Sequence, residues 1–169
     1  MRGYSMKTLQ LVIFVLAANF AVAATLEGEV VKVSDGDTVH VLAGKQKTKI
    51  RLDRIDAPES RQEYGREATK HLADLIFGKT VKVLYDKKDR YGRILGTIFM
   101  GDLEVNLEMV ATGNAWHYRQ FDKTIAYCDA ERMAREKELG LWANPSPICP
   151  QEWRRRRKHY EFEAERVDE

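Results

Sequence analysis

The chain has 169 residues and a formal net charge of +2, with 44% hydrophobic and 32% charged residues. This length and composition fit one globular domain with its own core, and they exclude a disordered chain and a small disulfide-dependent scaffold. Arg2 and Lys7 carry the whole excess charge, because 28 basic residues less these two leave 26, equal to the 26 acidic residues. A polyanionic partner would therefore be bound by a local patch of charge.

Residues 1–23 have the pattern of a secretory signal peptide. Met1 to Lys7 is basic, Leu9 to Phe20 is apolar, and the Ala-Val-Ala at residues 21–23 fits cleavage before Ala24. The alternative is a buried or membrane-anchoring helix, but the apolar run is short for a hydrocarbon core of about 30 Å. We expect a secreted or periplasmic protein whose mature form has no stable membrane association.

From Leu26 onward, polar residues alternate with Val, Ile and Thr, which predicts antiparallel strands separated by turns. The expected strands are Gly28 to Ser34, Thr38 to Leu42, Lys47 to Leu52, Thr80 to Tyr85 and Arg93 to Met100. The consecutive hairpins indicate an α+β fold rather than alternating strands and helices.

Three helices are predicted from apolar spacing and from glycines that follow the last periodic residue. The first covers Glu63 to Phe77 and the third covers Asp122 to Leu139. The second opens in VNLEMVATG, with Asn106 as N-cap and Gly113 as its stop. The expected buried faces are Ala68, Leu72, Leu75 and Ile76 on the first helix, and Ile125, Cys128, Met133 and Ala134 on the third, with Trp142 packing back.

Two acidic segments follow predicted strands, SDGDT at Ser34 to Thr38 and IRLDRIDAPES at Ile50 to Ser60. Acidic oxygens at strand ends can surround a hard cation, and a nearby arginine can face a bound anion. Asp37, Asp56 and Glu59 are thus candidates for a metal and base site. DGDT alone is also an ordinary turn, and we interpret Asp53 and Arg54 as a solvated pair.

The segment DKKDRYGR at residues 86–93 places four cations around Tyr91. Such a combination is typical where phosphate is held and a base is stacked, although a solvated turn with charged ends has the same composition. The cations are Lys87, Lys88, Arg90 and Arg93.

SDGDT, IRLDRIDAPE and DRYGR, in this order, resemble the motifs of the staphylococcal nuclease (thermonuclease) family over about Leu26 to Trp142. The resemblance implies an OB-type five-stranded antiparallel β-barrel with three helices. It also implies calcium-dependent hydrolysis of phosphodiester bonds in DNA and RNA by a monomer.

Matched motif by motif, the resemblance places the metal carboxylates at Asp37 and Asp56, and the three catalytic positions at Arg51, Glu59 and Arg93. The carbonyl of Ala57 would be a further metal ligand, at a position where the best-known member has threonine. Whether Glu59 is a true base or only positions water stays open, because both roles need a carboxylate in the same place.

The aromatic segment AWHYRQF at residues 115–121 is the second candidate for substrate contact. It resembles a family region with substrate-contacting tyrosines, so the predicted substrate-binding residues are Arg90, Tyr91, His117 and Tyr118. Alternating aromatic residues that close the core are an equally good interpretation.

Cys128 and Cys149 are the two cysteines of a chain with an export signal, which favours a disulfide that pins the C-terminal segment; two free thiols are the alternative.

We expect a compact domain at residues 24–144 and a C-terminal extension at residues 145–169, basic and then acidic. Arg154 to Lys158 could contact phosphate or pair with the acidic block, and we assign the extension no catalytic part.

Two other functions remain as alternatives. An OB barrel with a basic and aromatic face is also a single-strand nucleic-acid-binding module, but such a module gains nothing from carboxylates that face phosphate. A magnesium nuclease that uses Glu59 with Asp86 and Lys88 is disfavoured by the consecutive hairpins.

Overall fold

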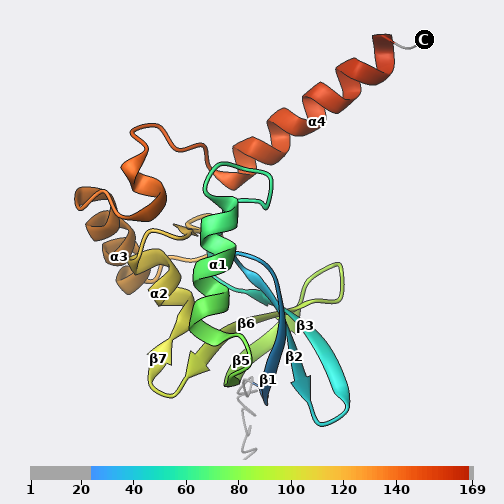
Figure 1. Ribbon diagram of the computed structural model, residues 1–169, viewed down its shortest axis with the longest axis vertical. Coiled ribbons are helices and arrows are strands. Elements are labelled where there is room, and N and C mark those ends of the chain that lie inside the picture. The colour runs from blue at the N-terminus through green and yellow to red at the C-terminus, as the bar shows by residue number, and fades with distance from the viewer. Residues whose placement is uncertain (1–23, 168–169) are drawn as a thin grey trace, which may run out of the picture.

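The computed structural model describes residues 24–167, with side chains through residue 159, and the predicted leader lies outside these residues. Five strands form a closed barrel in which neighbours pair in the order β3-β2-β1-β5-β6, and a parallel pairing of β3 with β6 closes the ring. This confirms the expected α+β fold with a five-stranded barrel (Figure 1). The barrel strands are β1 (Ala24–Asp35), β2 (Thr38–Ala43), β3 (Gln46–Leu52), β5 (Thr80–Lys88) and β6 (Ile94–Met100).

Strand β1 is long enough to pair on both sides. Its first half, Ala24 to Glu29, pairs with β5, and its second half, Glu29 to Asp35, pairs with β2. Two irregularities in the β1–β2 register bend the strand between these partners, as barrel closure requires. Gly28 lies at the crossing, where a Cβ atom would be 2.3 Å from the carbonyl oxygen of Leu42. Only glycine allows so close an approach.

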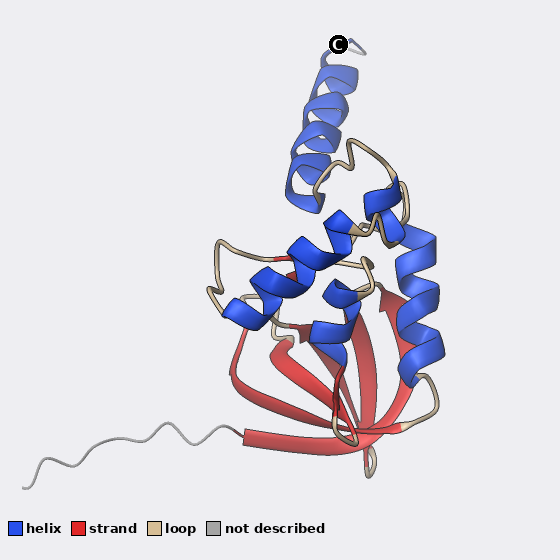
Figure 2. Cartoon of the chain, turned by 90° about the vertical axis from the view of Figure 1, so that its left-hand side faces the viewer, coloured by secondary structure: helices blue, strands red, loops and turns tan. Residues whose placement is uncertain are grey.

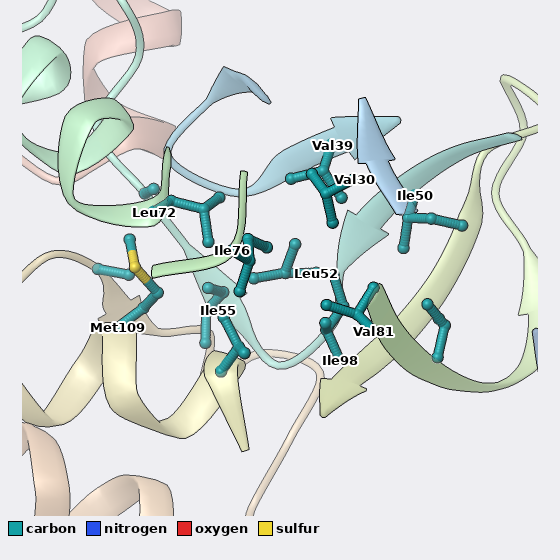
Figure 3. Packing of buried hydrophobic residues seen from close by; sticks show 14 of the residues in the cluster. Val30, Val39, Ile50, Leu52, Ile55, Leu72, Ile76, Val81, Ile98 and Met109 are labelled. Atoms are coloured by element: carbon teal, nitrogen blue, oxygen red, sulfur yellow. The ribbon is translucent and has the colours of Figure 1, made fainter. Parts of the chain in front are cut away.

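The core fills the barrel and the space under α1 (Gly65–Ile76), as Figure 3 shows for ten labelled side chains. Alternate strand residues point inward, which is the reason the period-two pattern predicted these strands correctly. Ala68, Leu72 and Ile76 are the buried face of α1, as predicted, and Leu75 is partly buried. Trp142 is also buried, as expected.

The remaining elements gather at one end of the barrel, and α4 extends away from it (Figure 2). They are β4 (Ile55–Asp56), β7 (Leu103–Glu104), α2 (Val105–Ala111), β8 (Trp116–His117), α3 (Ile125–Glu136), a 3-10 helix η1 (Gly140–Ala143) and α4 (Pro150–Val167). β4 and β8 form a separate antiparallel pair. Within residues 24–167, no helix has the length and apolar character needed to cross a membrane.

The predicted buried face of α3 is wrong in part. Ala134 is buried as predicted and Cys128 is half-buried, but Ile125 is 75% exposed and Met133 is also exposed. Tyr127 and Glu131 are buried in their place. Glu131 is tolerated inside because Arg119 and Arg135 both donate to its carboxylate, at 2.8 Å each. A buried charge with tertiary partners breaks the apolar periodicity, so spacing alone did not identify the full face.

The predicted N-cap role of Asn106 is also wrong, because α2 begins one residue earlier with Glu104 as its N-cap. The Asn106 side chain is fully buried and ties α2 to the barrel. Its Oδ1 accepts from the Ile98 amide at 3.0 Å, and its Nδ2 donates to the Asp53 carbonyl, the Asp53 carboxylate and the Gly96 carbonyl. Asp53 also accepts from Thr97, so it is part of this interior network in addition to its partly exposed ion pair with Arg54 at 3.9 Å.

Because Asn106 satisfies four polar groups in a dry environment, we expect Asn106→Ala to lower the free energy of unfolding by roughly 3 kcal/mol. Urea unfolding followed by circular dichroism measures this change. Asn144→Ala is the matched control, because Asn144 binds Glu63 at the surface and should cost no more than about 0.5 kcal/mol. An unchanged midpoint for Asn106→Ala would contradict the role of this network.

Candidate active site

The two acidic segments meet at one end of the barrel. The turn between β1 and β2 carries Asp37, and its carbonyl accepts from the Leu52 amide at 2.8 Å at the end of β3. The Ala57 amide, twenty residues further along the chain, donates to Asp37 Oδ2 at 2.9 Å. Gly36 permits this approach, because a Cβ atom there would lie 2.7 Å from Ala57 Cβ. The structure therefore joins SDGDT and IDAPE into one site.

Arg51 is the centre of this site. Its Nη2 atom lies 2.9 Å from Asp56 Oδ1 and 3.1 Å from Asp37 Oδ2. Its Nη1 atom donates to the carbonyls of Leu52 and Ile55, at 2.7 and 3.0 Å. These four contacts fix the guanidinium between the β3 end and β4, so its position does not depend on a bound ligand.

The carboxylates are buried and repel one another. Asp37 is 7% exposed and Asp56 is 4% exposed. Burial, with the charge of Asp37 adding to it, raises the pKa of Asp35 to about 7. Burial also raises the pKa of Asp56, and the charge of Asp37 adds to this, whereas Arg154 and Arg51 oppose it. Such a cluster favours binding of a further cation, because a cation reduces the repulsion between the carboxylates and offsets the free-energy cost of removing them from water.

The donor atoms are those of a hard-cation site. Two carboxylates and the Ala57 carbonyl supply oxygen, which Ca²⁺ and Mg²⁺ prefer, and no sulfur or imidazole lies among them. In the part of the chain that the structure describes, no group of three His, Cys, Asp or Glu side chains forms a complete ligand cluster. An ion on Asp37 and Asp56 would therefore complete its shell with carbonyl, water or substrate oxygens.

Glu59 lies on the turn that leads into α1. Its amide donates to Gln62 Oε1 at 3.1 Å, and its carbonyl accepts from the Gln62 amide at 2.8 Å. Gly65 is required beside it, since a Cβ atom there would be 1.9 Å from the Glu59 carbonyl oxygen. The Glu59 side chain is 36% exposed, so its carboxylate reaches solvent at the edge of the buried acids.

Arg93 lies near this site, but its charge is bound elsewhere. Arg93 directly precedes β6, whose Leu95 pairs in register with Arg51. The Arg93 Nε atom is 2.7 Å from Asp89 Oδ2, and this ion pair holds the side chain within its own turn. Of the predicted catalytic residues, the structure thus brings Arg51 and Glu59 to the acid cluster and leaves Arg93 on Asp89.

The residues predicted to bind substrate separate into two groups. Tyr91 is 69% exposed, with the guanidinium of Arg90 4.8 Å from its ring centre, so both are accessible. Tyr118 is half-buried and packs edge-on against Phe121. His117 is fully buried, between Asp122 at 2.8 Å and the Cys128 thiol at 3.5 Å. The prediction that His117 contacts substrate is therefore wrong, because β8 turns its ring toward α3.

The predicted disulfide is absent, because Cys128 and Cys149 are both free. Cys128 lies on α3 beside His117, whereas Cys149 packs against a separate cluster that contains Trp116 and Trp142. The two thiols thus belong to different packing clusters. An even number of cysteines in a chain with an export signal favoured a disulfide, but the number of cysteines carries no information about the distance between them.

Arg154 is the site residue that the sequence did not reveal. Its Nη1 atom donates to Glu59 Oε1 at 2.7 Å, and its Nη2 atom donates to Asp56 Oδ2 at 2.9 Å. The extension was assigned no catalytic part, and Arg154 to Lys158 were expected to contact phosphate or to pair with the acidic block; the structure instead places Arg154 on two acids of the site. The sequence signal was the basic run itself, which does not show that its first arginine meets a glutamate 95 residues earlier.

Comparison with known proteins agrees with this geometry. The family profile described as "Staphylococcal nuclease homologue" matches residues 49–144. An "Uncharacterized endonuclease" of Escherichia coli is 41% identical over 152 residues, which cover 89% of this chain and 99% of that protein. One of the same description from Haemophilus influenzae is 44% identical over 130 residues, covering 76% and 73%. A "Micrococcal nuclease" of Shigella flexneri is 40% identical over 156 residues, covering 86% and 90%.

A barrel with a buried acidic and arginine site at one end, together with these matches, defines a nucleic-acid hydrolase. The chain belongs to the staphylococcal nuclease family and is a nuclease of the endonuclease type.

Proposed function

We propose that this nuclease hydrolyses phosphodiester bonds of both DNA and RNA and that it depends on calcium. The observation that carries the proposal is the pair of buried acids Asp37 and Asp56, which share Arg51 and lie beside the solvent-exposed edge at Glu59. The hydrolysis of a phosphodiester gathers negative charge in the transition state, so the reaction needs cations in fixed positions. The site provides a fixed arginine and oxygen ligands for a metal.

Calcium would be held by the carboxylates of Asp37 and Asp56 and by the Ala57 carbonyl. When bound, the ion would neutralise part of the charge on the phosphate. The buried carboxylates support this assignment, since hard oxygen ligands match calcium and since the burial that raises the pKa of Asp56 makes a bound cation favourable there.

The chain's own residues would carry out the remaining steps. Arg51 would bind a non-bridging phosphate oxygen without reorganising, because two carbonyls and two carboxylates already hold it. Arg93 would bind another oxygen after leaving Asp89, and a local, partly exposed ion pair of this kind costs little to break. Glu59 would orient a water molecule for attack and accept its proton, since its carboxylate is the one that reaches solvent.

Substrate would extend from this centre toward the turn at residues 86–93. Tyr91 offers an exposed ring for stacking, and Arg90 and Arg93 lie within 4.8 and 5.6 Å of its centre. Tyr118 is a second candidate, at the accessible edge of the Tyr118–Phe121 pair. All these residues belong to one chain, which supports a monomer as the acting form.

We also propose export through the leader at residues 1–23. The sequence supports this, because a basic start, an apolar run and the Ala-Val-Ala at residues 21–23 precede Ala24.

The proposal is tested by incubating purified mature protein with DNA and with RNA across a calcium series, and then with chelator. We expect cleavage of both substrates that rises with calcium and stops on chelation, because the buried carboxylates repel phosphate without a metal. Protein that binds single strands but does not cut them at any calcium concentration would instead support the alternative, a nucleic-acid-binding barrel without catalysis.

We expect Glu59→Gln, Arg51→Ala and Arg93→Ala each to lower turnover by about two to three orders of magnitude, because each removes a group aimed at the transition state. Steady-state kinetics at saturating calcium measures this, with circular dichroism to establish folding. The control is Arg132→Ala, since Arg132 is an exposed α3 residue that pairs only with Asp129 and Glu136 among the contacts described. Full turnover in Glu59→Gln together with Arg93→Ala would contradict this assignment of roles.

A further inference from the structure

The first turn of α4 is fixed against the candidate active site. The Gln62 side chain, three residues after Glu59, donates to the Ile148 carbonyl at 2.5 Å. Trp153, in the first turn of α4, lines a cleft of about 510 Å³ together with Tyr64 and Trp116. These contacts hold α4 at its start, although the helix then extends away from the barrel (Figure 1).

Arg154 follows this anchor and reaches two acids of the site. Its guanidinium bridges Glu59 Oε1 and Asp56 Oδ2, with a longer contact of 3.4 Å to Asp56 Oδ1. A guanidinium has five N–H donors, so at least two remain after these three contacts. The side chain is 37% exposed, which leaves part of the guanidinium open to a ligand in solvent.

We propose that Arg154 is a further phosphate-binding residue of the nuclease, contributed by α4, which binds the nucleic-acid strand beside Glu59. This inference rests on the proposed function of the site. The same guanidinium lies against the residue assigned to the attacking water and against a carboxylate assigned to the metal. A phosphate that meets both of these groups therefore also lies within reach of the remaining Arg154 donors.

The lone pairs of the acids allow Arg154 to stay in place while a metal binds. Each carboxylate has about four acceptor positions. Asp56 uses them for Arg51 and Arg154, through three contacts, and Glu59 accepts from Arg154 through one oxygen only. A position therefore remains on Asp56 for a cation, and Glu59 Oε2 remains for water.

The sequence beyond Arg154 favours the same partner. Residues 150–159 contain five basic residues, 154–158, against the single acid Glu152. Residues 155–158 are exposed on the helix. A local positive field of this kind attracts a polyanionic strand toward the mouth of the site, as expected in a chain whose total charge is balanced.

The test compares Arg154→Ala and Arg154→Lys with the parent protein. Binding of a short fluorescein-labelled single-stranded DNA is followed by anisotropy at saturating calcium, in a Glu59→Gln background that keeps an acceptor oxygen and is expected to cleave slowly. The Michaelis constant is measured separately with Glu59 present. Arg156→Ala is the matched control, because it removes the same charge from the same helix and its described partner is Glu152, one turn earlier on that helix.

We expect Arg154→Ala to raise both the dissociation constant and the Michaelis constant about tenfold or more. The slope of log affinity against log salt should fall by about one, as for a lost phosphate contact. Arg154→Lys should recover part of the affinity, since lysine keeps the positive charge but lacks the planar guanidinium that can donate two parallel hydrogen bonds to a phosphate. Arg156→Ala should change both constants less than about threefold, because surface charge away from the site acts only through screened interactions.

Two results would overturn the inference. Unchanged constants in folded Arg154→Ala, or in Arg154→Lys if the alanine variant does not fold, would make Arg154 a counter-ion only. Tighter DNA binding or faster cleavage at saturating calcium would make it a latch that competes with substrate. Neither result affects the proposed function, which fails separately if wild-type protein shows no calcium-dependent cleavage.

Discussion

The burial of like charges around Arg51 is the constraint on which the rest of the structure depends. Asp37 and Asp56 lie almost entirely out of water, and a pair of this kind is stable only if each oxygen has a partner. Arg51 supplies two of these partners and the Ala57 amide supplies another. Any change that moves one of these groups leaves a buried charge without compensation, which typically costs several kcal/mol.

The barrel meets this constraint by fixing both acidic turns from opposite directions. β2 and β3 pair Thr38 with Arg51, so the residue after Asp37 and the central arginine are neighbours in one ladder. The parallel pairing of β3 with β6 holds the other side of β3. The functional groups therefore stand on turns and strand ends, while a closed sheet and the α1 face supply the rigidity.

Local patterns predicted the parts of the structure that depend on local physics. Strand alternation and the α1 face were correct because those residues face a continuous apolar core (Figure 3). The motifs also predicted that Asp37, Asp56 and Glu59 follow strands, and in the structure Asp37 lies in the turn before β2, Asp56 ends β4 and Glu59 lies on the turn after it. Part of the α3 face was missed because Glu131 is buried by arginines that come from elsewhere, and Asn106 was missed because its four partners lie on other elements.

Long-range contacts explain the remaining differences. His117 and Cys128 meet because β8 pairs with β4, a two-residue interaction that no sequence pattern marks. Arg154 is the first of four consecutive arginines, which the sequence alone cannot tell apart. Only the packing of Trp153 and Ile148 distinguishes the first arginine from the other three. The packing of the segment before a basic run therefore determines which of its residues reaches a site.

The account as a whole depends on the buried carboxylates being a cation site rather than an ion-pair network that only stabilises the fold. Calorimetric titration of calcium into purified protein, with Asp56→Asn and the surface variant Asp74→Asn beside it, tests this most directly. The account predicts saturable calcium binding by wild type and Asp74→Asn, since Asp74 is exposed and pairs with Lys70 on α1, and loss of most of this affinity in Asp56→Asn. No calcium binding by the wild type, or equal affinity in folded Asp56→Asn, would contradict it.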